Sequence, residues 1–137
     1  YQHQLLVSFL NIPVVSNHID LNLLNTSALD NGIVDYIKQK YMRPLAVSPL
    51  AGGRIEHGTD EQALKLRKKL NEMATKYDSN IESVAVAWLI KLGALPLIGT
   101  LEEKRIQNIV DAFEIEMDHQ DWYELYNTTK PTQSVLD

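Results

Sequence analysis

Three short apolar segments of the chain have the length and the boundaries of β-strands. The first covers residues 13–22, the second covers 44–48 and ends at Pro49, and the third covers 95–98 and ends at Gly99. Apolar runs of this length between proline and glycine residues are typical of strands. The pattern therefore predicts three strands. Between them lie longer segments in which apolar residues recur with a different period.

These longer segments have the period of amphipathic helices. Apolar residues recur at intervals of three and four over residues 61–77 and 80–92, and Gly93 marks the end of the second run. Shorter segments of the same kind cover residues 31–40 and 4–10. The sequence therefore predicts helices before, between and after the strands.

Capping residues stand before the later helices. Ser79 with Glu82, and Thr100 with Glu103, have the spacing of a capping box, in which each side chain bonds the other residue's backbone amide. Asp118 has the position of an N-cap before a last helix. These signals predict that a helix begins directly after Ser79, Thr100 and Asp118.

The predicted order, α-β-α-β-α-α-β-α-α, is that of an α/β fold. A helix between two strands returns the chain to the same end of the sheet, so the strands pair in parallel with the helices outside. The apolar run 45–47 predicts cover on both faces of the sheet. Three strands cannot close a barrel and leave two unpaired edges, so we expect either a fragment of a larger α/β fold or a sheet completed by a second copy.

Composition narrows the class of protein. The 137 residues include 13 Lys and Arg, 18 Asp and Glu and no cysteine, and the net charge is −5. A chain of this length normally forms one domain, and its acidic balance argues against a nucleic-acid partner. The lack of cysteine excludes disulfides and thiol nucleophiles and suits a cytoplasmic protein. No apolar run is long enough for a membrane helix, and a start at Tyr1 instead of methionine is expected of a piece of a longer protein.

Candidate chemistry lies beyond the carboxyl ends of the strands, where parallel α/β folds bind their ligands. Gly99 permits close approach to the backbone, Thr100 is predicted to cap a helix whose free amides attract anions, and Arg105 lies one turn into that helix. The loop 52–54, Gly-Gly-Arg, is a second candidate anion site. The alternatives are a capped helix with a solvated arginine and a simple turn.

Two other kinds of site do not fit the sequence. Ser16, His18 and Asp20 would share one strand face with parallel side chains, about 6–7 Å apart at the backbone, which is too far for a hydrogen-bonded catalytic relay. The four histidines lack the spacing of metal ligands. His18 alone stays a candidate for contact with a ligand, and its alternative role is that of a core or surface histidine.

Four segments of the chain resemble the C-terminal part of the aldo-keto reductase family. They are SNHIDL at 16–21, RPLAVSPLAGGR at 43–54, AVAWL at 85–89 and LPLIGT at 95–100. The resemblance covers residues 1–137, in order, as one partial domain. It implies an α/β fold that is the C-terminal fragment of a (β/α)8 TIM-type barrel, in which this chain supplies the sixth to eighth strands, their helices and the C-terminal helix.

The resemblance also implies a function and a set of cofactor-binding residues. The family reduces small carbonyl compounds by hydride transfer from NADP(H). By this resemblance the binding residues are His18 at the nicotinamide amide, Ser48, Leu50, Gly52 and Gly53 along the pyrophosphate, and Gly99, Thr100 and Arg105 around the adenosine 2′-phosphate.

The catalytic half of the family's site has no counterpart in this sequence. The proton-donating tyrosine and its partners belong to the first four strands of the family's barrel, so Tyr36, Tyr41 and Tyr77 are not assigned that role. We therefore expect no carbonyl reduction by this chain alone. The alternative function is a non-catalytic nucleotide-binding or protein-interaction module, and the open strand edges and inner faces predict self-association.

Some positions depart from the family's pattern. Val47 stands where an aromatic residue commonly stacks on the nicotinamide, and His18 stands where a glutamine is common. Leu101, Glu102 and Glu103 replace basic residues that often follow the Gly-Thr pair. These three replacements weaken the expected preference for a 2′-phosphate.

Overall fold

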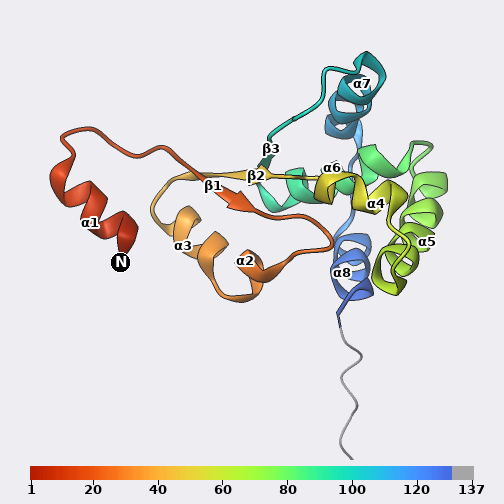
Figure 1. Ribbon diagram of the computed structural model, residues 1–137, viewed down its shortest axis with the longest axis horizontal. Coiled ribbons are helices and arrows are strands. Elements are labelled where there is room, and N and C mark those ends of the chain that lie inside the picture. The colour runs from red at the N-terminus through yellow and green to blue at the C-terminus, as the bar shows by residue number, and fades with distance from the viewer. Residues whose placement is uncertain (131–137) are drawn as a thin grey trace, which may run out of the picture.

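The sheet has three parallel strands, as the sequence predicts. The computed structural model describes residues 1–130, with β1 (Ser16–Asp20), β2 (Arg43–Val47) and β3 (Leu95–Pro96) in the order β1-β2-β3 (Figure 1). Ser16 pairs with Arg43 at the start of the sheet, and Leu45 pairs with Leu95. All three strands therefore end at the same edge.

Two strands are shorter than predicted. β1 begins at Ser16 and not at residue 13, and β3 spans two residues in place of the predicted 95–98. Pro96 has no backbone N–H to donate, which limits the hydrogen-bond ladder of β3. The amide of Leu97 still donates to the carbonyl oxygen of Ala46 at 2.9 Å, so the chain stays beside β2 past the end of the strand.

Residues 1–130 also contain eight α-helices and two short 3-10 helices, which turns and loops connect. They are α1 (Gln2–Phe9), α2 (Ser27–Asp30), α3 (Ile33–Gln39), η1 (Ala51–Gly53), α4 (Arg54–His57), α5 (Glu61–Lys76), α6 (Ile81–Leu92), α7 (Glu103–Asp111), η2 (Ala112–Glu114) and α8 (His119–Thr128). The segment predicted as one helix over 31–40 begins as α3 after Gly32, which has a φ of 81° and separates it from α2.

The capping prediction for α8 is confirmed, whereas the one for α6 is wrong. Asp118 accepts a hydrogen bond from the amide of Asp121 at 2.8 Å and caps α8. The predicted box of Ser79 with Glu82 is wrong, because Asn80 caps α6 by accepting from the amide of Ser83 at 2.9 Å. Gly93 ends α6 in the left-handed conformation, as predicted.

Only one face of the sheet is buried. Pro44 and Ala46 of β2 and Ile19 of β1 are buried under the helices. On the opposite face His18 and Val47 are exposed, and Leu45 is half-buried. The prediction of cover on both faces is therefore wrong within residues 1–130. Of the apolar run at 45–47, Ala46 lies on the buried face, whereas Leu45 and Val47 lie on the face that is partly or fully exposed in this part of the chain.

The main core lies where α5, α6 and α8 meet. Trp88 of α6 and Trp122 of α8 stack with ring centroids 5.0 Å apart. Each indole Nε1 donates to the backbone carbonyl oxygen of the other tryptophan, at 3.1 and 3.0 Å. Buried indole N–H groups need a partner, so these reciprocal bonds fix the two helices in one register.

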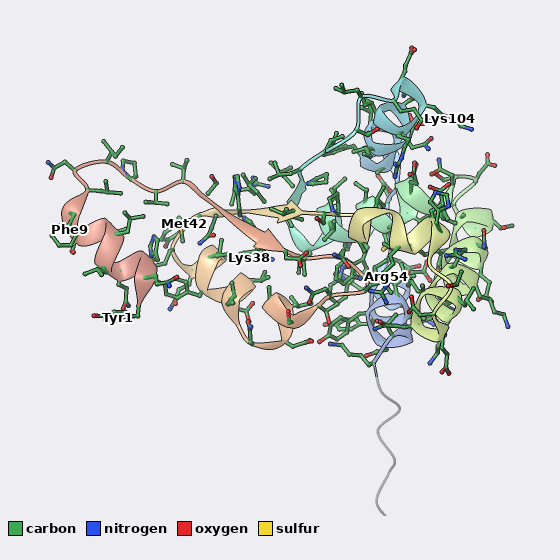
Figure 2. The ribbon with its side chains drawn as sticks, viewed as in Figure 1. Tyr1, Phe9, Lys38, Met42, Arg54 and Lys104 are labelled. Atoms are coloured by element: carbon green, nitrogen blue, oxygen red, sulfur yellow. The ribbon has the colours of Figure 1, made fainter. Side chains whose placement is uncertain are left out.

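The first helix lies apart from this core. α1 has no buried residue and sits at the opposite end of the molecule from α5 and α8 (Figure 1). Tyr1 and Phe9, at its two ends, are largely exposed (Figure 2). A contact of 3.0 Å between His3 Nδ1 and the Tyr36 hydroxyl connects α1 to α3.

No helix among residues 1–130 combines the length and the apolar character that crossing a bilayer requires.

Replacement of Trp88 by phenylalanine tests the reciprocal pair. The variant leaves the carbonyl oxygen of Trp122 without its donor and removes packed volume, so the free energy of unfolding should fall by about 2 kcal/mol or more. Urea unfolding followed by circular dichroism measures the loss. The control is Tyr123→Phe at an exposed position of α8, which should change the value by less than about 0.5 kcal/mol; equal effects would show that the pair has no special role.

Candidate functional site

A pocket of about 480 Å³ opens beyond the carboxyl ends of β2 and β3. Seven of the eight predicted binding residues line it, namely Ser48, Leu50, Gly52, Gly53, Gly99, Thr100 and Arg105. A second hollow of about 380 Å³ adjoins it beyond the end of β1 and shares Ser48 and Gly52 with it. The parallel sheet thus brings together residues that lie more than 50 positions apart in the sequence.

The eighth predicted residue is outside both hollows. His18 lies in the middle of β1, paired with Leu45, on the open face of the sheet. Its side chain is exposed and lines neither hollow. Contact between His18 and a ligand therefore stays a prediction.

The loop after β2 has an unusual backbone. Ser48, Ala51, Gly52 and Gly53 all have φ between 53° and 87°, a region that favours glycine. A side chain at Gly52 would meet no atom within 4 Å, so the loop is open to the pocket at that point. The amides of Ala51 and Gly53 donate to carbonyl oxygens of the loop itself, at 2.9 and 3.1 Å. Only part of the predicted amide cradle is therefore free for an anion.

Asn22 holds the end of β1 against this loop. Its side chain is buried, and its Nδ2 donates to the carbonyl oxygen of Ser48 at 3.1 Å. Its Oδ1 accepts from the amides of Leu24 and Asn25, each at 2.9 Å. This role of Asn22 is not among the predictions from the sequence, although the Asn-Leu-Leu-Asn segment that follows β1 is typical of a turn closed by an asparagine side chain.

The helix after Thr100 begins later than predicted. α7 starts at Glu103 with Glu102 as N-cap, so the capping box of Thr100 with Glu103 is wrong. Thr100 Oγ1 instead accepts from the amide of Glu102 at 3.1 Å, in a turn before the helix. The carboxylates of Glu102 and Glu103 stand at the positive end of the helix dipole, where they compete with any anion for it.

Arg105 reaches the pocket as one half of an ion pair. Its Nε and Nη2 each lie 2.8 Å from Oε1 of Glu82, which is only 6% exposed. The other carboxylate oxygen of Glu82 accepts from Asn108 Nδ2 at 2.8 Å. The arginine predicted as a grip for phosphate is thus already paired, because Glu82 is part of this contact and not of a capping box.

Arg54 is paired as well. Its Nε and Nη2 donate to the two carboxylate oxygens of Asp60, at 3.1 and 2.8 Å. These bonds, together with the amide of Ala63, lower the pKa of Asp60 to about 2. Arg54 comes from the start of α4, directly after the glycine loop (Figure 2). The loop 52–54 therefore presents a neutralised arginine to the second hollow.

The tyrosines of residues 1–130 lie away from the pocket and the adjoining hollow. Within residues 1–130, no tyrosine lines either hollow. Tyr36 contacts His3, Tyr77 donates to the carboxylate of Asp121, and Tyr41 is 97% exposed. Burial and the Asp121 carboxylate raise the pKa of Tyr77. The same part of the chain has no group of three or more acidic or histidine side chains placed to hold a metal ion.

Replacement of Asn22 by alanine tests its hold on the loop. The variant removes the three hydrogen bonds of this side chain, to the Ser48 carbonyl oxygen and from the amides of Leu24 and Asn25, so the free energy of unfolding should fall by about 1–3 kcal/mol. Amide hydrogen exchange should also become faster, mainly in residues 48–53. A loss of global stability alone would accelerate exchange throughout the protein. Asn11→Ala, at an exposed position before β1, is the matched control. Wild-type stability in Asn22→Ala would contradict this role.

The chain is similar to proteins of known family. The model of the aldo/keto reductase family matches residues 4–128. The 6-dehydroglucose reductase of Agrobacterium fabrum is 32% identical over 128 residues, which cover 92% of this chain and 42% of the relative. Oxidoreductase YdhF of Escherichia coli is 31% identical over 127 residues, which cover 90% of this chain and 42% of YdhF. This chain therefore spans about two fifths of the length of these curated relatives.

Solved structures show the same fold. The thermostable aldo-keto reductase Tm1743 is 20% identical with a TM-score of 0.74, over 91% of this chain and 43% of that protein. A mutant of Gox0644 in complex with NADPH is 19% identical with a TM-score of 0.70, over 92% of this chain and 42% of that protein. The family match and the parallel sheet agree, so this chain belongs to the aldo/keto reductase family and has the fold of the C-terminal part of its TIM-type barrel.

Proposed function

We propose that this chain supplies the cofactor-binding part of an NADP(H)-dependent oxidoreductase that reduces carbonyl compounds in the cytoplasm. The observation that supports it best is the pocket at the carboxyl ends of β2 and β3, with two glycine segments and one arginine in its lining. A pocket of about 480 Å³ lies within the range of small-molecule and cofactor sites. Family membership supports the same proposal.

The residues of the pocket fit a dinucleotide. A Cβ at Gly52 or Gly99 would meet no atom within 4 Å, so an extended phosphate chain can approach the backbone at both places. In this proposal Ser48, Leu50, Gly52 and Gly53 lie along the pyrophosphate. Gly99, Thr100 and Arg105 surround the adenosine phosphate, and His18 reaches the nicotinamide amide from the open sheet face.

The proposal divides the reaction between two parts of a protein. Bound NADPH supplies the hydride that reduces the substrate carbonyl. The residues of this chain hold the adenosine and pyrophosphate end of that cofactor, and the proton donor comes from segments outside residues 1–137. The chain by itself is therefore expected to show no turnover.

A titration of the 137-residue chain with NADPH, followed by cofactor fluorescence, tests the binding role. Gly99→Val adds a branched side chain to the pocket lining at a position where a Cβ meets no atom within 4 Å and the backbone is not left-handed. It should weaken binding by about tenfold or more. Thr59→Val, outside the pocket lining, should bind like wild type. Wild-type affinity in Gly99→Val would contradict the proposal, and so would turnover of aldehydes by the chain alone.

The alternative function is a non-catalytic nucleotide-binding or interaction module. The observation that favours it is the lack of any tyrosine in the lining of the pocket, within the described residues. A longer protein that carries the remaining strands and reduces aldehydes with NADPH would favour the enzyme. Nucleotide binding without turnover by such a protein would favour the module.

We also propose that the isolated chain associates with a second copy through the open face of the sheet. Within residues 1–130 no strand pairs with the outer edge of β1, and Val47 and Leu95 on the open face of the sheet are exposed. Unpaired edges and apolar faces of this kind favour pairing with another chain.

Light scattering at increasing concentration measures the association. We expect a mass of twice the chain. Leu95→Lys, on the open face, should yield monomer, whereas Leu64→Lys, at an exposed position of α5, should not. A wild-type monomer at high concentration would refute the association.

A further inference from the structure

The pocket has a buried carboxylate behind its arginine. Glu82 lies in the first turn of α6 and is 6% exposed, whereas the side chain of Arg105 is 30% exposed and lines the pocket. A buried carboxylate is stable only when it is paired and hydrogen-bonded. Glu82 meets this requirement entirely through residues of α7.

These contacts fix the orientation of Arg105. Two of its five N–H donors, on Nε and Nη2, point to one oxygen of Glu82, and Asn108 occupies the other oxygen. Asn108 is itself held, because its Oδ1 accepts from Asn80 at 3.2 Å and its carbonyl oxygen accepts from Ser83 at 2.6 Å. The guanidinium therefore presents its remaining donors to the pocket in a fixed direction.

The same contacts cancel the charge of Arg105. The pair of Glu82 with Arg105 is neutral as a whole, and Glu102 and Glu103 add negative charge at the start of α7. A neutral pair still donates hydrogen bonds to a ribose hydroxyl or to a phosphate. It offers little extra attraction for a phosphate monoester with two negative charges.

We propose that Glu82 is a positioning residue that determines cofactor specificity by holding Arg105 in place while cancelling its charge. The chain then binds NADH and NADPH with similar affinity, in spite of the additional phosphate of NADPH. This inference rests on the proposed function and goes beyond it, since it concerns the choice between the two cofactors. Glu82 acts through Arg105 and touches no ligand itself.

Parallel titrations of the 137-residue chain with NADH and NADPH test the inference. In wild type the two dissociation constants should lie within about threefold of each other. Glu82→Gln keeps the size of the side chain and one of its two acceptor oxygens, and it frees the charge of Arg105. It should tighten NADPH binding by about fivefold or more and change NADH binding by less than about twofold.

Two further variants separate charge from structure. Combined Glu82→Gln and Arg105→Gln replaces one neutral pair by another and should keep the wild-type ratio of the two affinities. Glu61→Gln changes the net charge equally at an exposed position of α5 and should also leave the ratio unchanged. A purely structural role of Glu82 would lower the melting temperature and both affinities without moving the ratio.

The outcomes distinguish this inference from the proposed function. A wild-type preference for NADPH of tenfold or more would overturn the inference, as would an unchanged ratio in a folded Glu82→Gln variant. In both cases dinucleotide binding would remain. If neither cofactor binds the wild-type chain, the proposed function and the inference fail together. If Glu82→Gln does not fold, the ratio of the NADH and NADPH dissociation constants in wild type and in the double variant tests the inference.

Discussion

Parallel pairing of three strands is the constraint on which the candidate site depends. Since the helical crossovers return the chain to the same end of the sheet, the carboxyl ends of β1, β2 and β3 meet at one edge. The glycine loop after β2 and the Gly-Thr pair after β3 therefore line one pocket, although about 45 residues separate them in the chain. Asn22 draws the end of β1 to the same place through the Ser48 carbonyl.

Both arginines near this edge are paired with carboxylates. Arg54 binds Asp60, which also caps α5, and Arg105 binds Glu82, which belongs to the first turn of α6. In each case the carboxylate stands at the start of a helix, Asp60 as the N-cap of α5 and Glu82 in the first turn of α6, and positions an arginine donor near the pocket. The charges of both arginines are therefore already compensated, which distinguishes the site from an open cationic phosphate site.

Much of this arrangement could be predicted from the sequence. The three strands, their parallel pairing, the apolar stripes of α5 and α6 and the N-cap of α8 follow from local patterns that the structure keeps. The family and fold follow from four motifs, and the residues of the glycine loop and of the Gly-Thr pair meet as expected.

The errors concern side chains whose partners are distant in the sequence. Glu82 has the correct spacing for a capping box, and no local rule indicates that Arg105, 23 residues later, takes its carboxylate. Asn80 and not Ser79 caps α6. Both residue types suit an N-cap, and the choice between them depends on the residue at which the extended backbone turns into the helix. Cover on both faces of the sheet was expected because the strand is apolar, but a face can be apolar and still await elements outside residues 1–130.

The stacked tryptophans have a practical consequence for spectroscopy of this protein. Trp88 and Trp122 are the only tryptophans of the chain, and both lie at the junction of α6 and α8. Emission excited selectively in the tryptophans therefore reports the integrity of that junction. Detachment of α1 or opening of the loop after β2 would leave the emission spectrum unchanged, so the two ends of this molecule can lose their order at different temperatures while a tryptophan signal records a single transition.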